Sequence, residues 1–521
     1  MKKRFFLFCV ITILLMASCD DFLNQNPDPR VDWKIEDQIS LLLVSAYSTA
    51  DYAAMCELSS DNIIDNHSPD ENGDNFLFSS AYRFHDEAFA WQAITDSRQD
   101  ATSDLWEKFY RAIAVCNHAL DEMDKMETKD TTLNLSAQRG EALVSRAYHH
   151  FILVNLFCQT YKDENQTDLG IPYITWPENT VLEKYDRETV PVIYRKIETD
   201  LLAGIDLIND TKYKQPKYRF NKAAANSFAA RFFLYKREWE KVIKYADVAL
   251  GEVPKFRNWY GSFPNSESLV YWYIDHTSSN NYLLMASNST AMRIYVGRYG
   301  VARAAEKEVF SASGPSGNMS AAFRGKLYFF QNQDAGIILG PSAIELFEYS
   351  DKFAGIGWAH KVRPEFTAEQ TILDRAEAKA HLGLLDDAYA DFYIYEDARH
   401  DKTPTVQNPN PILRQFQEQI QNAPSKPLNN EKISSSWIIT PEIEPYIQCV
   451  LFYRRLETIH YGNRWFDLKR YGIEIEHVVG RAARREFLRW DDERRAFQIP
   501  IEVLSAEMEP NPRPPTLNEV K

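Results

Sequence analysis

Apolar and polar residues alternate with the period of an α-helix over most of the chain from about Ile39 onward. In the stretch 104–123 the apolar side chains fall three or four residues apart and therefore share one helical face. These side chains are Leu105, Phe109, Ala112, Ile113, Cys116 and Leu120. Residues 136–157 and 191–208 have the same spacing. The pattern predicts long helices that bury their apolar faces against one another.

Two later stretches each consist of two helical segments joined by a short turn. Residues 220–250 break near position 237, and residues 368–395 break at the sequence GLLDDA. In both stretches, small residues stack on one face of the first helix. They are Ala225 and Ala229 in one copy and Ala376 and Ala380 in the other. A helix–turn–helix unit of about 34 residues with small residues at these positions resembles a tetratricopeptide repeat.

The segment between these two copies, 251–365, is different in kind. Gly, Ser, Asn and Pro are frequent, aromatic residues cluster, and the helical period is weak. We expect long loops with short strands or 3₁₀ turns, and loops on a rigid scaffold often carry binding residues. The predicted fold is therefore all-α dominated, with a scaffold of tetratricopeptide-like helical pairs and a loop-rich, partly irregular insertion with short strands.

The N-terminus has the pattern of a lipoprotein signal. Three cations at positions 2–4 precede an apolar run, 5–16, which is shorter than the about 20 residues that span a bilayer. The sequence LMASC then resembles a bacterial lipobox, in which the thiol of the cysteine is acylated and the chain is cut before it. A thiol suits this chemistry because its thiolate is strongly nucleophilic. We predict that Cys19 carries the lipid.

These patterns divide the chain into five parts. We expect a signal peptide at 1–18, a polar tether at 19–38, an N-terminal helical region with tetratricopeptide-like pairs at 39–250, a loop-rich ligand-binding insertion at 251–365 and a C-terminal region at 366–521.

Charge and cysteine content exclude some functions. The net charge of −15 argues against nucleic acid as a partner, because binding to phosphate needs a basic surface. Cys56, Cys116, Cys158 and Cys449 are widely spaced and include no CxxC pair, so zinc is not expected and buried free thiols are favoured over a disulfide. No cofactor or metal site is predicted. The sequence DENGDN, 70–75, lacks the spacing of a calcium loop and is interpreted as a polar turn.

The C-terminal region holds the most distinctive motif, RRLETIHYGNRWFDLKRYG, from Arg454 to Gly472. It predicts a helix, a break at Gly462 and a second helix, with basic and acidic side chains that form ion pairs between the two. Residues 497–512, FQIPIEVLSAEMEPNP, are interrupted by prolines and are expected to be extended.

In order along the chain, these motifs resemble the SusD/RagB family of Bacteroidetes lipoproteins. The resemblance includes the lipobox followed by DDFL, the helix GEALVSRAYHHFILVNLF, the two helical pairs, the sequence GNRWFDLKR and the sequence IPIEVLSAEMEPNP. It covers essentially the whole chain. The sequence HYGNR departs from the Glu-Gly-x-Arg that is usual in the family, but the glycine and the arginine are kept.

The resemblance implies a protein of the outer cell surface that is anchored by lipid in the outer membrane. Such proteins pair with a SusC-like TonB-dependent transporter and deliver to it a bound nutrient, usually a glycan and in RagB-like members a peptide. Asp20 and Asp21 match the acidic signal that follows the lipidated cysteine in surface lipoproteins of this phylum. The resemblance also implies that the Arg454–Arg470 charges hold the structure together and do not catalyse a reaction.

A glycan site needs exposed aromatic rings beside polar side chains, because sugars present apolar C–H faces and many hydroxyls. The candidates lie in or near the irregular stretches. They are Trp91, Trp259, Tyr260, Trp272, Tyr273 and Tyr282, with Tyr295 and Tyr299 as further aromatic residues.

Two rival functions remain at this point. A surface glycoside hydrolase is possible because its paired carboxylates can be distant in sequence, although no GxSxG, HExxH or Rossmann motif is present. A purely structural tetratricopeptide adaptor would bind a partner protein without a small ligand. We predict a binding protein and not an enzyme.

The lipid anchor can be tested directly. Cys19→Ala removes the acylated thiol, so we expect the protein to leave the membrane fraction for the soluble fraction when cells are lysed and centrifuged. Continued sedimentation of the variant with membranes would contradict the anchor.

Overall fold

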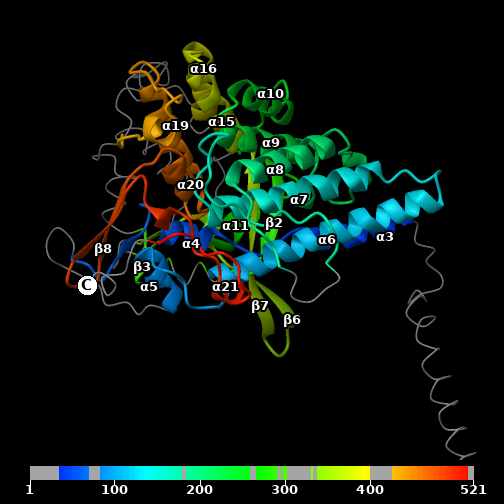
Figure 1. Ribbon diagram of the computed structural model, residues 1–521, viewed down its shortest axis with the longest axis horizontal. Helices are drawn as coiled ribbons and strands as arrows, with labels where there is room; N and C mark the ends of the chain where they lie inside the picture. Colours follow the sequence, from blue (N-terminus) through cyan, green and yellow to red (C-terminus); the bar gives the residue numbers. More distant parts are fainter. Residues whose placement is uncertain are drawn as a thin grey trace, which may run out of the picture.

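The computed structural model describes residues 35–69, 82–178, 184–257, 266–289, 291, 295, 297–301, 330–332, 337–398 and 425–513. Helices dominate this part of the chain, which confirms the predicted fold class (Figure 1). The α-helices are α3 (Ile35–Leu42), α4 (Ala53–Leu58), α5 (Arg83–Phe89), α6 (Thr102–Lys129), α7 (Ser136–Phe157), α8 (Val190–Ile205), α9 (Lys222–Lys236), α10 (Trp239–Leu250), α11 (Ser266–Tyr273), α15 (Ala368–His381), α16 (Leu385–Asp397), α18 (Asn430–Ile433), α19 (Glu444–Glu457), α20 (Asn463–Arg470) and α21 (Ile501–Ser505).

Short 3₁₀ helices and four small antiparallel sheets complete the described fold. The 3₁₀ helices are η1 (Leu43–Ala46), η2 (Asp210–Lys212), η3 (Pro216–Tyr218), η5 (Pro341–Ala343) and η6 (Glu493–Arg495). The strands are β1 (Ile64–Asp65), β2 (Asn281–Ser287), β3 (Tyr299–Gly300), β4 (Phe330–Asn332), β5 (Ile337–Leu339), β6 (Leu346–Asp351), β7 (Ile356–Thr367), β8 (Ile475–Val479) and β9 (Arg484–Leu488). The sheets are β1–β3, β2–β7–β6, β4–β5 and β8–β9.

The two longest helices, α6 and α7, pack against each other and differ in burial. Helix α6 buries the apolar stripe predicted from its spacing, and its opposite face is exposed. Helix α7 is buried on nearly every side, as expected for a helix with apolar residues around its circumference. Helix α3 lies along α6 and contributes Ile39 to a small core with Cys116 and Leu120 (Figure 1). Helix α3 begins at Ile35, inside the stretch expected to be tether.

The two predicted helical pairs exist and pack directly on each other. Helices α9 and α10 form the first pair, α15 and α16 form the second, and α15 contacts both α9 and α10. The small residues that stack on one face of each first helix, Ala225 and Ala229 in α9 and Ala376 and Ala380 in α15, are completely buried. The first turn contains Arg237 in the left-handed region, with a φ of 62°. Helices far apart in sequence thus form one continuous stack.

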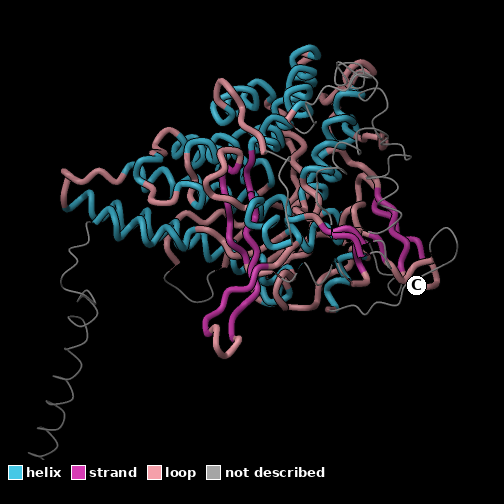
Figure 2. The backbone as a smooth tube through the Cα atoms, turned by 180° about the vertical axis from the view of Figure 1, so that it is seen from behind, coloured by secondary structure: helices cyan, strands magenta, loops and turns pink. Residues whose placement is uncertain are grey.

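The described part of the insertion is more regular than the sequence predicted. Strand β7 has 12 residues, longer than the expected short strands, and pairs with two different partners. Its second half, residues 361–367, pairs with β2 inside the body, and its first half, residues 356–360, pairs with β6. Strand β6 and the first half of β7 form a hairpin that projects from the body (Figures 1 and 2). Strand β7 is long because it continues from the hairpin into the body, where its second half is held by pairing with β2.

The C-terminal region contains one correction and one element that was not predicted. Residues 501–505 form helix α21, although the stretch 497–512 was expected to be extended. Pro500 directly precedes this helix, where a proline is tolerated because it supplies a fixed φ and its missing N–H would not be bonded. Strands β8 and β9 form a hairpin that the sequence analysis did not identify.

The predicted break at Gly462 is confirmed. Gly462 has a φ of 83° and joins α19 to α20. A Cβ atom at this position would lie 2.7 Å from the Cβ of Cys56 in α4, so only glycine fits both the backbone conformation and the contact. The backbone N–H of Gly462 donates to Glu57 Oε1 at 2.9 Å. The turn is therefore packed directly on the N-terminal helices.

Buried charges hold helices α9, α15, α19 and α20 together. The basic members are Arg231, Arg454 and Arg470, and the acidic members are Asp374, Glu377 and Asp467. We call these six residues the charge cluster. Arg454 contacts all three acids, at 3.0 Å for Asp374, 2.6 Å for Glu377 and 3.2 Å for Asp467.

Charge balance makes this burial tolerable. Three guanidinium groups face three carboxylates, and Arg470 completes the set with 2.9 Å to Glu377 and 2.7 Å to Asp467. Burial alone would raise the pKa of Glu377, but the two arginines outweigh burial and hold its pKa well below the usual value. Removal of one member would leave an unpaired buried charge.

Glu377→Gln is therefore expected to lower the free energy of unfolding by about 3–5 kcal/mol, because Arg454 and Arg470 both lose a charged partner. Chemical denaturation followed by circular dichroism measures the change. Glu122→Gln is the matched control, since its ion pair with Lys125 at 2.8 Å is exposed and screened by solvent, so its loss should change the unfolding free energy far less. Equal losses in the two variants would contradict a structural role for the cluster.

Candidate functional site

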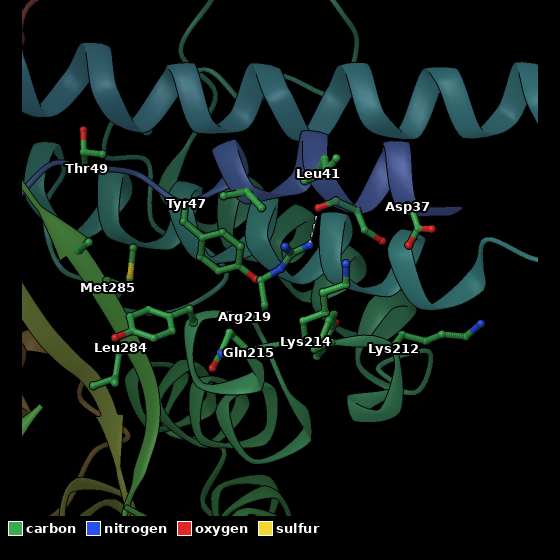
Figure 3. Close-up of a pocket in the computed structure, with 15 residues that line it drawn as sticks. Asp37, Leu41, Tyr47, Thr49, Lys212, Lys214, Gln215, Arg219, Leu284 and Met285 are labelled. Carbon is green, nitrogen blue, oxygen red and sulfur yellow. Dashed lines mark hydrogen bonds between the residues drawn. The ribbon is translucent and has the colours of Figure 1, made fainter. Parts of the chain in front are cut away.

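A pocket of about 520 Å³ lies between the N-terminal helices, the segment that contains η2 and η3, and strand β2 (Figure 3). Its lining residues come from three separate parts of the sequence. They are Asp37, Ser40, Leu41, Val44, Tyr47 and Thr49, then Lys212, Tyr213, Lys214, Gln215, Tyr218 and Arg219, and finally Leu284, Met285 and Ala286. We call this site the tyrosine pocket.

The apolar wall of the tyrosine pocket follows from the packing of α3 and η1. Ile39 and Leu43 face the body and are buried. Leu41 and Val44 point elsewhere and line the pocket, with 53% and 57% of their surfaces exposed. An exposed apolar surface on a concave wall is typical of a ligand site.

The inner side of the tyrosine pocket is formed by Tyr47 and Arg219, which hydrogen bonds hold in fixed positions. The hydroxyl of Tyr47 donates to Glu141 Oε1 at 2.6 Å and accepts from the backbone N–H of Phe220 at 2.7 Å. Arg219 donates to Glu141 Oε2 and to the backbone carbonyl of Ser40, each at 2.9 Å. Burial would lower the pKa of Arg219, but its hydrogen bond and ion pair with Glu141 raise it. Tyr47 and Arg219 are thus held in place before any ligand binds.

The outer part of the tyrosine pocket mixes rings and charges. Tyr213 is half-buried and Tyr218 is 37% exposed, and burial raises the pKa of both phenols, so both hydroxyls are protonated at neutral pH. Asp37, Lys212 and Lys214 lie toward one end, and Leu284 and Met285 lie toward the other (Figure 3). The pocket offers aromatic and apolar surfaces beside hydrogen-bonding groups.

The chemistry of the lining residues favours binding over catalysis. Among the described residues that line the pocket, Asp37 is the only carboxylate. A glycosidase that works with two carboxylates needs both of them around the scissile bond. The tyrosine pocket lacks that pair.

Exposed rings also gather on the β6–β7 hairpin. Phe347 and Tyr349 of β6 and Trp358 of β7 are each about half exposed, and Phe353 in the turn is fully exposed. The rings of Phe347 and Tyr349 contact each other at a centroid distance of 4.8 Å. This surface is convex, whereas the tyrosine pocket is concave.

Three aromatic candidates from the sequence lie in the core, which corrects the expectation that their rings are exposed. Trp91, Tyr273 and Tyr282 are 4%, 4% and 5% exposed. The Trp91 ring stacks on His477 at 4.2 Å, and its N–H donates to the backbone carbonyl of Ser59 at 2.9 Å. Large rings bury more apolar area than other side chains, so the core competes with the surface for them.

The other aromatic candidates are half-buried, buried or outside the described residues. Trp272 is half-buried, and its ring lies 5.5 Å from the guanidinium of Arg257. Its role in a glycan platform stays a prediction. Trp259 and Tyr260, together with Cys19, lie outside the described residues. Tyr295 and Tyr299, the two further aromatic residues, are buried.

The paired histidines have the packing role that adjacent positions on a helix suggest. His149 and His150 are completely buried in α7. The backbone N–H of Ser48 donates to His149 Nε2 at 3.1 Å, and that of Ile174 donates to His150 Nε2 at 3.2 Å. Burial lowers the pKa of His149 to about 4, so its ring is neutral at pH 7. Both histidines serve the core.

The four cysteines among the described residues are free and buried, as expected: Cys56, Cys116, Cys158 and Cys449. In the part of the chain that the structure describes, no three His, Cys, Asp or Glu side chains converge as a metal site would require. Over the same residues, no helix combines the length and the apolar character needed to cross a membrane.

The sequence analysis missed both surfaces on which the structure exposes apolar side chains. Leu41 in α3 and Val44 in η1 belong to a run of apolar residues, 41–44, that is too long for one buried helical face, and such a run is a usable signal of an exposed apolar surface. On the hairpin, Phe347 and Tyr349 alternate with polar residues, as on one face of a strand. Such alternation on either side of a short turn predicts a hairpin.

Comparison with known proteins agrees with this architecture. A SusD-like family model, described as starch-binding and associating with the outer membrane, matches residues 21–234. No curated protein matches the sequence. A SusD superfamily protein from Bacteroides fragilis has a similar structure, with a TM-score of 0.60 and 18% identity, over 91% of this chain and 97% of that chain.

Two further solved structures share the fold. A SusD superfamily protein from Bacteroides thetaiotaomicron has a TM-score of 0.62 and 16% identity, over 92% of this chain and 100% of that one. A SusD-like protein described as laminarin-binding has a TM-score of 0.55 and 16% identity, over the same shares of the two chains. The N-terminal part of this chain is therefore similar to the SusD-like family, and nearly the whole chain has the fold of the SusD superfamily structures.

Proposed function

We propose that this protein is a lipid-anchored protein of the outer cell surface that binds an extracellular glycan and delivers it to a SusC-like TonB-dependent transporter. The observation that carries the proposal is the match of residues 21–234 to a family described as starch-binding and associating with the outer membrane. The lipobox at Cys19 and the acidic residues that follow it support the location. The shared fold of a laminarin-binding SusD-like protein supports a glycan as the ligand.

Within the described residues, the tyrosine pocket is where we place the glycan. Its volume of about 520 Å³ is within the range of small-molecule sites, which is roughly 300–1,000 Å³. Tyr213 and Tyr218 offer rings to the C–H faces of a sugar, and Gln215 and Arg219 offer hydrogen-bond donors to its hydroxyls. The fixed position of Arg219 lowers the cost of ordering the site on binding.

The proposed mechanism is capture followed by transfer, and no covalent bond changes. A neutral sugar and two protonated tyrosines form contacts that do not depend on a proton transfer. The ligand therefore leaves by dissociation when the transporter offers a better site. The rival hydrolase would need a second carboxylate near Asp37, which the described lining of the pocket does not supply.

Tyr218→Ala is expected to weaken binding to the retained polysaccharide roughly tenfold, because it removes part of an apolar surface from the contact with the ligand. The measurement is retardation of the purified protein in native gels that contain laminarin, soluble starch, a plant polysaccharide or no additive. Binding of a peptide mixture, measured by titration calorimetry, tests the RagB-like alternative.

Phe487→Ala is the matched control, because Phe487 is an exposed ring, at 50% against 37% for Tyr218, on β9, a strand that does not line the pocket. Leu41→Asp, on the opposite wall from Tyr218, should reproduce the loss if the ligand lies between the two walls. Retention that is unchanged in both pocket variants would remove the tyrosine pocket from the site. Retention that is lost in the Phe487 control would show that the effect is not specific.

A further inference from the structure

The β6–β7 hairpin presents large apolar side chains to solvent in a pattern that folding of this chain does not require. Phe347, Tyr349, Phe353, Ile356 and Trp358 are all exposed, from 49% for Trp358 to 106% for Phe353. We call residues 346–360 the aromatic hairpin. It projects away from the helical body in both views (Figures 1 and 2). Exposed apolar side chains gathered in this way on one element indicate an interaction site.

The rings lie on both faces of the hairpin. Side chains directly opposite each other in a strand pair share a face, and neighbours along a strand alternate. Tyr349 is opposite Gly357, and Phe347 is opposite Ala359, so these two rings share one face. Trp358 is opposite Glu348, so Trp358 and Ile356 share the other face.

Local packing fixes the rings of the first face. A Cβ atom at Gly357 would lie 2.7 Å from Cε1 of Phe347, which means that the Phe347 ring lies over this glycine. The Phe347 ring also contacts the Tyr349 ring. Rings that are already ordered lose less entropy when they are buried in a complex.

The base of the aromatic hairpin is fixed in the body. Lys361 and Arg363, which follow the hairpin in β7, form buried ion pairs with Asp51 at 2.9 and 3.1 Å. Arg363 also pairs with Glu365 at 2.6 Å. These ion pairs join the base of the hairpin to the N-terminal region near α4. In the described sheet β6 is an edge strand, so its outer backbone groups are free to pair with another strand.

The occupant that best fits these features is a protein that encloses the hairpin. A glycan chain lying on a platform would need rings on one face only. An anionic membrane surface would repel Glu348 and Asp351, which lie among the rings, as well as a chain of net charge −15. A second copy of the chain would carry the same negative charge. An apolar groove in another protein can cover both faces and pair with the free edge of β6.

We propose that the aromatic hairpin is the element by which this protein docks into an apolar groove of its transporter. This inference rests on the proposed function for the identity of the partner. The hairpin and the tyrosine pocket are formed by different halves of the insertion sheet, β6 with the first half of β7 on one side and β2 on the other. Docking and ligand binding are therefore separable by mutation.

Site-specific photo-crosslinking in cells tests the docking. The photoreactive residue p-benzoylphenylalanine replaces Tyr349, Phe353 or Trp358 in the full chain, which is expressed in its own host. Irradiation is expected to link all three positions to one β-barrel transporter, identified by mass spectrometry, because the groove contacts both faces. The same residue at position 487, an exposed ring on β9, is the control and should give no transporter adduct.

Other outcomes overturn the proposal. Adducts with lipid, with a second copy of the chain or with a protein that is not a transporter would each contradict it, as would adducts from one face only. The double variant Phe353→Ser and Trp358→Ser should lower co-purification of the transporter at least about tenfold while its unfolding transition is unchanged.

The same double variant separates this inference from the proposed function. Polysaccharide retention by the double variant should equal that of the unmodified protein, and its loss would make the hairpin a glycan platform and overturn the docking. If the unmodified protein retains no polysaccharide but the transporter adducts form, the ligand proposal fails and the docking stands.

Discussion

Arg454 and Arg470 lie inside the protein, and the arrangement of the helices depends on how their charges are balanced. Glu377 from α15 contacts both guanidinium groups, and Asp467 from α20 does the same. These two buried arginines are balanced by carboxylates from other helices at contact distance, and separating a pair would leave an unpaired buried charge, so α15, α19 and α20 cannot shift independently. This requirement fixes the register in which the C-terminal helices pack on the two helical pairs.

Buried ion pairs also position the two surfaces for which we propose binding roles, the tyrosine pocket and the aromatic hairpin. Asp51 pairs with Lys361 and Arg363 and thereby fixes strand β7 to the N-terminal region. Strand β2 pairs with the fixed half of β7 and forms one wall of the tyrosine pocket, and β6 pairs with the projecting half and forms the aromatic hairpin. One strand therefore sets the positions of both the tyrosine pocket and the aromatic hairpin.

The sequence predicts the helical scaffold well because its signals are local. The periodicity of apolar residues identifies α6 and α7, and the turn at Gly462 follows from one glycine between two helical segments. The charge motif from Arg454 onward predicts ion pairs between α19 and α20, but not their partners in α15, because contacts between distant segments leave no local pattern. A cluster of aromatic residues in the sequence also does not show which of their rings are exposed and which are buried. Trp91 lies in the core because its large apolar surface stabilises the protein there.

The central claim is that this protein captures a glycan without cleaving it. The most direct test is to incubate the purified protein with the polysaccharide that it retains and to measure the reducing ends that appear over time. The account predicts stable retention with no increase in reducing ends above the protein-free sample. A steady increase that scales with protein concentration would contradict it, because only hydrolysis of glycosidic bonds generates new reducing ends.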